Sequence, residues 1–312
     1  MEEETTMQNK ARLNPKNDFL FKRLFGEEAG KPLLIGLLNA VLRKDGKARI
    51  TNVIIVDDTR LSRELVENKE VVMDIKCEVE GEENVNVEMQ IRRYERMDSR
   101  SLYYVSGMLG DSLRQGQPYS SVKRAIGINI LDHVYLPLDK YHSTFHLYED
   151  EQRDYLLTDL LELHFIECPK FRKLAFDLHD PLHRWLRFLE QSTTREQLKE
   201  LMGVDEVIKE AEERLDYLAS DEETRGLYRM REKALHDQAS LVEDAEQRGI
   251  KQGLERGLKQ GMKQGSEQRQ KEIALKMLEE GIPVSVISKV VGMDEEHIVQ
   301  MHKNVQSAVD HE

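Results

Sequence analysis

Two neighbouring segments alternate apolar and polar residues, VVMDIKCEV at 71–79 and VNVEMQI at 85–91. In both segments the odd positions are apolar, whereas the even positions from Asp74 to Gln90 are mostly polar or charged. Because successive side chains of a strand point to opposite faces, this pattern predicts two half-buried strands whose polar residues share a face. Folding about Gly81–Glu82–Glu83 would pair them as a hairpin.

This hairpin would bring two carboxylates close together. With the turn at Gly81–Glu82–Glu83, Asp74 lies opposite Gln90 and Lys76 lies opposite Glu88, so Asp74 and Glu88 are within one cross-strand diagonal. Such a pair can hold a hard divalent cation. The ordinary alternative is a solvated face of an antiparallel hairpin, where acids and lysines occur together for solubility.

The flanking segments predict a helix before the hairpin and a strand after it. NDFLFKRLFG (17–26) carries a helical apolar stripe, with Asn17 or Asp18 where an N-cap belongs. Asp18 can therefore cap the helix or reach toward a metal. AIGINILDH (125–133) is apolar almost throughout, which indicates a buried strand. PLLIGLLNAVL (32–42) predicts a core helix, because it is too short to span a bilayer.

A basic stretch follows the hairpin. Residues 92–124 hold seven Lys or Arg and three acids, in a chain whose net charge is −13. A local reversal of this kind is typical of a contact with backbone phosphates. Arg100 and Tyr104 are spaced i, i+4 and share a helix face, where a guanidinium and a phenol could hold phosphate. In the alternative, the tyrosine packs under the sheet and Arg100 bridges a nearby acid.

These residues together resemble the Rpn-type recombination-promoting nucleases, also labelled transposases, of the PD-(D/E)XK nuclease superfamily. The resemblance extends weakly into the C-terminal region. It rests on the order and spacing of NDFLFKRLF, Asp74 with Glu88-x-Gln90, RSLYYVSGML (100–109) followed by QGQPYSSV, and IGINILDH.

The resemblance implies an α/β fold, with a restriction-endonuclease-like mixed sheet flanked by helices and an α-helical C-terminal extension. It implies a Mg²⁺-dependent DNA endonuclease that hydrolyses phosphodiester bonds and promotes recombination. In this interpretation Asp74 and Glu88 hold the metal, Asp18 assists from the first helix, and Gln90 takes the place usually held by lysine. Mg²⁺ suits such a site because it prefers carboxylate oxygens and water. The expected DNA contacts are Arg92, Arg93, Arg100 and Tyr104.

Two residues depart from the family pattern, and the second departure affects the mechanism. Met73 replaces the proline expected before the first acid, which should change only the strand shape. Gln90 cannot accept a proton, so it can orient a water but cannot be the base. Lys76 is an auxiliary candidate for the missing ammonium, although a pairing with Glu88 or Glu78 is the ordinary explanation. The alternative function is a catalytically inactive nucleic-acid-binding or oligomerising protein that retains the nuclease fold.

The composition argues against several other classes of protein. Two cysteines, Cys77 and Cys168, argue against a disulfide scaffold or zinc ribbon and favour a reducing cytoplasm. The N-terminus MEEETTMQNK lacks the apolar region of a signal peptide, and no membrane association is expected.

The second half predicts helices. We expect a nuclease-like core over 1–180, a helical packing region over 181–248, a connector over 249–270 and a helix-turn-helix-like module over 271–312. Within this half, 155–167, 180–191 and 195–249 have helical periodicity, Trp185 is an expected core anchor, and His164 and His183 are expected to be structural.

Glycine recurs at every fourth position from Gly249 to Gly265, which favours a flexible linker over a helix whose glycine face meets another chain. The last module should break at Gly281–Pro283 and at Gly292, with Asp294 as an N-cap. Its last helix opens with acids, so docking or homo-oligomerisation is favoured over DNA reading.

Overall fold

The structure, a computed structural model, describes residues 12–42, 49–56 and 74–309. The chain divides into two compact units, Met1–His236 and Asp237–Glu312. No helix in the described ranges is long and apolar enough to cross a membrane.

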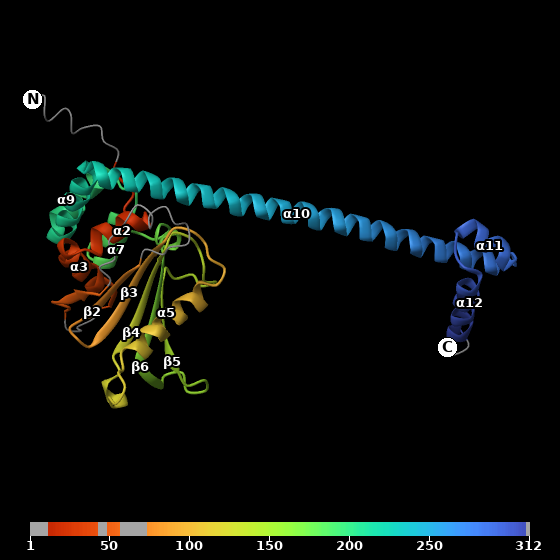
Figure 1. The fold of residues 1–312 in the computed structure, drawn as a ribbon, viewed down its shortest axis with the longest axis horizontal. Helices are drawn as coiled ribbons and strands as arrows, with labels where there is room; N and C mark the ends of the chain where they lie inside the picture. The colour runs from red at the N-terminus through yellow and green to blue at the C-terminus, as the bar shows by residue number, and fades with distance from the viewer. Residues whose placement is uncertain (1–11, 43–48, 57–73, 310–312) are drawn as a thin grey trace, which may run out of the picture. The chain divides into compact units, whose positions relative to one another are not determined.

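The first unit is built on a six-stranded mixed sheet with the order β1-β2-β3-β4-β6-β5 (Figure 1). Strands β3, β4 and β6 pair in parallel, and the other neighbours pair antiparallel. This sheet and its flanking helices confirm the predicted fold class. The strands are β1 (Val53–Ile55), β2 (Ile75–Val79), β3 (Glu83–Gln90), β4 (Arg124–Leu131), β5 (His142–Tyr148) and β6 (Leu156–Glu167).

Helices cover both faces of the sheet. Helices α2, α3 and α7 lie on one side and α5 lies on the other (Figure 1). The helical elements of the first unit are α2 (Asp18–Phe25), η2 (Glu28–Gly30), α3 (Lys31–Leu42), α5 (Met97–Asp111), η3 (Tyr119–Ser121), α6 (Cys168–Phe171), α7 (Pro181–Leu189), α8 (Arg195–Val204), α9 (Glu206–Ser220) and the first part of α10 (Glu222–Glu279).

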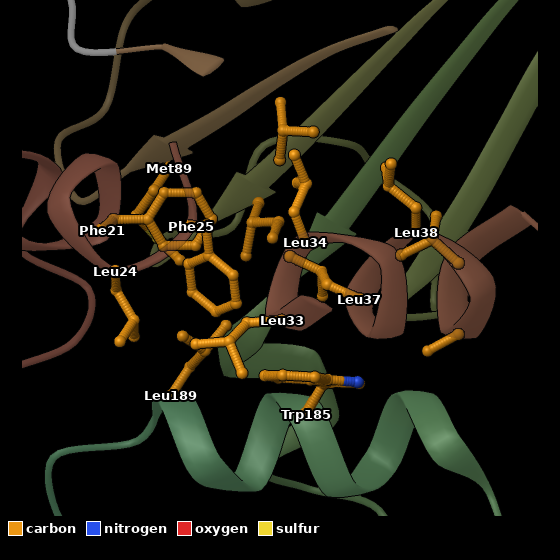
Figure 2. Close-up of a cluster of buried hydrophobic side chains, with 14 of the residues drawn as sticks. Phe21, Leu24, Phe25, Leu33, Leu34, Leu37, Leu38, Met89, Trp185 and Leu189 are labelled. Carbon is orange, nitrogen blue, oxygen red and sulfur yellow. The ribbon is translucent and has the colours of Figure 1, made fainter. Parts of the chain in front are cut away.

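The main core lies between the sheet and α2, α3 and α7 (Figure 2). Trp185 is 2% exposed and its ring centroid lies 5.5 Å from that of Phe25, so the expected core anchor is confirmed. Phe21 and Met89 meet in the same cluster, which joins α2 to β3. Burial of this many apolar side chains fixes α2 against the strand that carries Glu88.

A smaller core lies under α5. Met97 and Val105 of α5 pack on Ala125 and Phe165 of the sheet. Gly127 allows this close approach, because a Cβ at that position would lie 2.8 Å from Val105 Cγ2. The position of α5 along the sheet is therefore set by packing.

The segment 155–167 forms strand β6 rather than the predicted helix. The spacing of its apolar residues is compatible with a helix or a strand, but β6 lies between β4 and β5 and pairs with both. Pairing on two sides satisfies its backbone and overrides the local pattern. The helices expected within 180–191 and 195–249 are confirmed.

The glycine run lies inside the continuous helix α10, so the expectation of a flexible linker is wrong. Between the glycines, each group of three residues consists mostly of Lys, Gln, Glu, Arg, Leu or Met, which are strong helix formers. Their propensities offset the cost of about 1 kcal/mol for each glycine.

The second unit ends in the predicted succession of three helices. After α10 come α11 (Val284–Val291) and α12 (Glu295–Val309). Gly292 terminates α11 in the left-handed conformation, with φ of 70°. Ala274, Ile287 and Ile298 join the three helices in a small core.

A buried charge cluster joins β4, β5 and β6. His164 Nε2 lies 2.7 Å from Glu162 Oε1, and His164 Nδ1 lies 2.8 Å from His142 Nε2. Arg124 also binds Glu162. These contacts support the expectation that His164 is structural. Burial alone would raise the pKa of Glu162, but the hydrogen bond and charge of His164 and the charge of Arg124 lower it to about 2.

We predict that Glu162→Gln lowers the free energy of unfolding at neutral pH and that the loss shrinks in acid. The folded-state pKa lies below the ordinary value, so the charged carboxylate stabilises the protein above roughly pH 5 and this stabilisation disappears as the pH falls toward 2. Urea denaturation over this pH range measures the effect. Glu213→Gln, at an exposed position, is the control; a loss that does not change with pH would contradict the prediction.

We predict that Gly30→Ala destabilises the first unit by about 2 kcal/mol or more, because its Cβ would lie 2.1 Å from the Leu24 carbonyl oxygen at the joint between α2 and α3. Gly203→Ala is the matched control, since its Cβ meets nothing within 4 Å and alanine favours the helix. Chemical denaturation compares both variants with the parent chain. Equal midpoints for the two variants would refute the expected clash.

Candidate active site

The hairpin register brings Asp74 and Glu88 together more directly than the sequence suggests. Ile75 pairs with Val87 and Lys76 pairs with Asn86, so the same register continued by one residue sets Asp74 opposite Glu88. The expected pairs, Asp74 with Gln90 and Lys76 with Glu88, are wrong by two residues.

The position of the turn explains this shift. The turn is Glu80–Gly81–Glu82, one residue earlier than predicted, and Val79 pairs with Glu83. Glu80 and Gly81 both have positive φ, 51° and 78°. Moving a turn by one residue moves every cross-strand pair by two. Residues 71–73, including Met73, lie outside the described residues.

The alternation of faces holds, but the polar face is covered around Glu88. Ile75, Cys77, Val85 and Val87 point into the main core as predicted. On the opposite face Glu88 is only 1% exposed, because α5 packs over β3. A solvated hairpin face therefore does not account for Glu88.

The burial of Glu88 changes its acidity. Burial raises its pKa, the charge of Arg100 lowers it, and the charges of Asp74 and Asp18 raise it further, to about 7. Two other carboxylates, Asp74 and Asp18, thus act electrostatically on Glu88. A cation at this position would stabilise the ionised form of Glu88.

Arg100 of α5 is the cation nearest to Glu88 in the described part of the chain. Its Nη2 lies 3.3 Å from Glu88 Oε1, and its guanidinium stacks on Tyr94 and Tyr104, at 5.0 and 5.5 Å from the ring centroids. The expected common face of Arg100 and Tyr104 is confirmed. Glu88 Oε1 and Arg100 Nη2 are buried and have no hydrogen-bond partner among the described residues. The pair therefore retains unused capacity for a ligand.

Asp18 is the first residue of α2. The N-cap is Asn17, whose side chain accepts a hydrogen bond from the Leu20 N–H, while Asp18 Oδ1 accepts one from the Phe19 N–H and Asp18 also makes a longer-range contact. Arg231 of α10 provides it: Arg231 Nε lies 3.0 Å from Asp18 Oδ1 and Nη2 lies 2.5 Å from Oδ2. Sequence reasoning misses Arg231, because it is one of many charges in a helical segment and only its burial, at 2% exposed, distinguishes it.

The other residues predicted for the site, Arg92, Gln90 and Arg93, lie at or near the same end of the sheet. Arg92 lies near Asp18, Tyr94 and Arg231, and burial lowers its pKa. Gln90 ends β3 beside Leu131 and is partly buried. Arg93 is exposed and near His133.

Lys76 does not form the ion pairs considered for it. Glu88 contacts Arg100 instead, and Glu78 is paired with Lys123 at 2.8 Å. Among the described residues Lys76 has no carboxylate partner.

Asp74 and Glu88 fit a hard divalent cation in chemistry. Both are carboxylates, both are buried, and Glu88 Oε1 has no hydrogen bond to any residue in the described part of the chain. Asp18, Asp74 and Glu88 do not form a set whose ligand atoms all lie within 4.8 Å of one another.

Within the described ranges, one set of three potential metal ligands does converge within 4.8 Å: Asp132, Cys168 and Glu190. Lys16 lies 2.8 Å from Asp132 and 3.0 Å from Glu190, and Arg172 binds both acids. Burial raises the pKa of the Cys168 thiol to about 12. This set is a balanced ion-pair cluster rather than a metal site.

The chain matches one family of known proteins. A family model described as PD-(D/E)XK nuclease family transposase matches residues 15–245, which contain the whole sheet, α2, α5 and Arg231. No significant match was found among curated proteins or solved structures. Since the match extends over most of the chain and the sheet carries paired acids on adjacent strands, the chain belongs to the PD-(D/E)XK nuclease family transposases.

Proposed function

We propose that this protein is a divalent-metal-dependent endonuclease that hydrolyses phosphodiester bonds of DNA. The observation that carries the proposal is the buried Glu88 carboxylate, which faces the Asp74 position across the hairpin and whose Oε1 forms no hydrogen bond with the described residues. Asp74 and Glu88 would hold the ion, with Mg²⁺ as the expected one. Such an ion supplies Lewis-acid stabilisation of a phosphate and a more acidic bound water.

Positive charge beside the acids would hold the phosphate. Arg100 is 3.3 Å from Glu88 and its guanidinium is kept in place by two tyrosine rings. It takes over the cationic role that a lysine usually has in this superfamily. Arg92 would add a second contact at the same end of the sheet, and Tyr104 and the exposed Arg93 would extend the phosphate path.

Gln90 and Asp18 would have supporting roles in the reaction. Gln90 can position a water through its amide but cannot accept its proton. Asp18, fixed by Arg231, adds negative potential to the site. We assign Asp18 a supporting role rather than that of a direct ligand, because both of its oxygens contact the guanidinium.

The match to a transposase family supports a wider role in DNA recombination. We propose that cleavage promotes DNA recombination in the cytoplasm and that copies associate through the C-terminal helices. The alternative, a catalytically inactive binding protein, is favoured only by Gln90 in the lysine position. Arg100 weakens that alternative, because it offers the site a cation from a different element.

Glu88→Gln should reduce DNA cleavage by at least about 100-fold, because the amide cannot supply the charge that holds the metal and the metal contributes several kcal/mol to the transition state. A plasmid-nicking assay with Mg²⁺ and with EDTA measures this. Glu82→Gln, on the exposed turn, is the control. Full activity of Glu88→Gln, or cleavage that persists in EDTA, would be incompatible with the proposal.

Arg100→Met should lower the cleavage rate by roughly 100-fold, as expected for loss of a preorganised charge at the reacting phosphate. Arg100→Lys should retain part of the activity, since it keeps the charge but loses the planar fork. Thermal unfolding of each variant verifies that the fold is kept, and Arg96→Met, at an exposed arginine, is the control. Equal rates for Arg100→Met and the parent chain would remove Arg100 from the site.

A further inference from the structure

A groove runs along the polar face of the hairpin, between β2–β3 and α5. Its volume is about 870 Å³. Lys76, Glu78 and Asn84 line it from the strands, and Tyr103 and Tyr104 line it from α5. The segment after α5 contributes Arg114, Gln117 and Lys123.

The groove is continuous with the candidate active site. Tyr104 lines the groove, and the same ring stacks against Arg100, whose guanidinium is in contact with Glu88. Asn84, Asn86 and Glu88 are alternate residues of β3 and so form one polar row from the groove to the site. Asn86 is 5% exposed and its Oδ1 has no hydrogen-bond partner in the described part of the chain.

The aromatic side chains in the groove are suited to unpaired bases. Tyr103 is 78% exposed, and its ring lies edge-on to that of Tyr104, with centroids 6.0 Å apart. Bases of a duplex are stacked on each other and cannot present a face to a tyrosine ring, whereas bases of a single strand can. One turn further along α5, Gly107 leaves the helix surface bare, since a Cβ there would meet nothing within 4 Å.

The charges in the groove favour a phosphate backbone. Three basic side chains and two acidic ones line it, and the acid Glu78 is neutralised by Lys123 at 2.8 Å. Lys76 is half-buried and lines the groove, and its ammonium forms no hydrogen bond or ion pair with the residues that the structure describes. An ammonium that is partly removed from water and lacks an acid partner is a ready contact for a phosphate.

We infer that this groove binds an unpaired stretch of the nucleic-acid strand leading to the active site, with Tyr103 stacking on a base and Lys76 contacting a phosphate. The inference rests on the proposed nuclease function and adds a preference to it. The substrate class would be DNA with a single-stranded segment beside the cleaved bond, rather than uninterrupted duplex.

The test measures binding of labelled oligo(dT) and of a duplex of equal length by fluorescence anisotropy, in the full chain carrying Glu88→Gln to prevent cleavage. Tyr103→Ala should weaken oligo(dT) binding about tenfold and leave duplex binding unchanged. Lys76→Gln should weaken oligo(dT) binding and reduce its dependence on salt by about one phosphate contact. Tyr217→Ala, at an exposed tyrosine on α9, is the matched control and should change neither.

Two results would overturn the inference. One is equal oligo(dT) affinity for Tyr103→Ala and its parent. The other is competition by thymidine monophosphate as effective as that by oligo(dT) at equal nucleotide concentration, which would indicate a small-molecule site.

A cleavage assay of the protein with Glu88 intact distinguishes failure of this inference from failure of the proposed function. If duplex plasmid is cut in Mg²⁺ while Tyr103→Ala changes neither binding nor cleavage of a flapped substrate, the groove assignment alone is wrong. If no substrate is cut but oligo(dT) binding depends on Tyr103, the nuclease proposal fails and the strand-binding groove remains.

Discussion

A carboxylate removed from water needs a partner, and in this protein the partner of Glu88 is the guanidinium of Arg100. The two groups lie 3.3 Å apart between the sheet and α5, without a well-formed hydrogen bond. Burial of a charge with so little compensation costs stability, so the surrounding structure must hold the pair in place. Neighbouring contacts do this: Ser101 donates a hydrogen bond to Asn129 at 2.8 Å, and Gly127 lets Val105 approach the sheet. Because these contacts fix α5, they also fix Arg100 over Glu88.

The opposite side of the sheet contributes the other half of the site. α2 is held against β3 by Phe21 and Phe25 in the main core, and its first residue, Asp18, therefore lies where its charge acts on Glu88. Arg231 of α10 binds Asp18 through both oxygens. Three acids and three arginines, Arg92, Arg100 and Arg231, thus meet at one end of the sheet from separate elements. A cation or phosphate entering this region would exchange partners among charges that are already present, rather than create a charge in an apolar core.

The sequence predicts the parts of this arrangement that depend on local pattern. Alternation along β2 and β3, the cap at Asn17 and the common face of Arg100 and Tyr104 all follow from strand and helix geometry. The register does not, because a turn can begin at Glu80 or Gly81 with little local difference, and the choice decides whether Asp74 faces Glu88 or Gln90. The segment 155–167 is a strand because β4 and β5 lie on either side of it, which no local window contains. Arg231 is distant from Asp18 in sequence, and only the folded structure of the first unit reveals their contact.

The two acidic clusters near the ends of the strands illustrate what separates a structural site from a functional one. Asp132, Cys168 and Glu190 lie within 4.8 Å of one another and satisfy the distances of a metal site, yet Lys16 and Arg172 already bind both carboxylates. Asp18, Asp74 and Glu88 do not converge in this way, but Glu88 has one ion pair without a hydrogen bond and a pKa raised to about 7. Distance alone would select the first cluster. The incompletely compensated charge of Glu88 instead favours the site of Asp74 and Glu88. A cation binds where it stabilises a carboxylate that the protein has not already stabilised, and it gains little where protein cations already pair with the carboxylates.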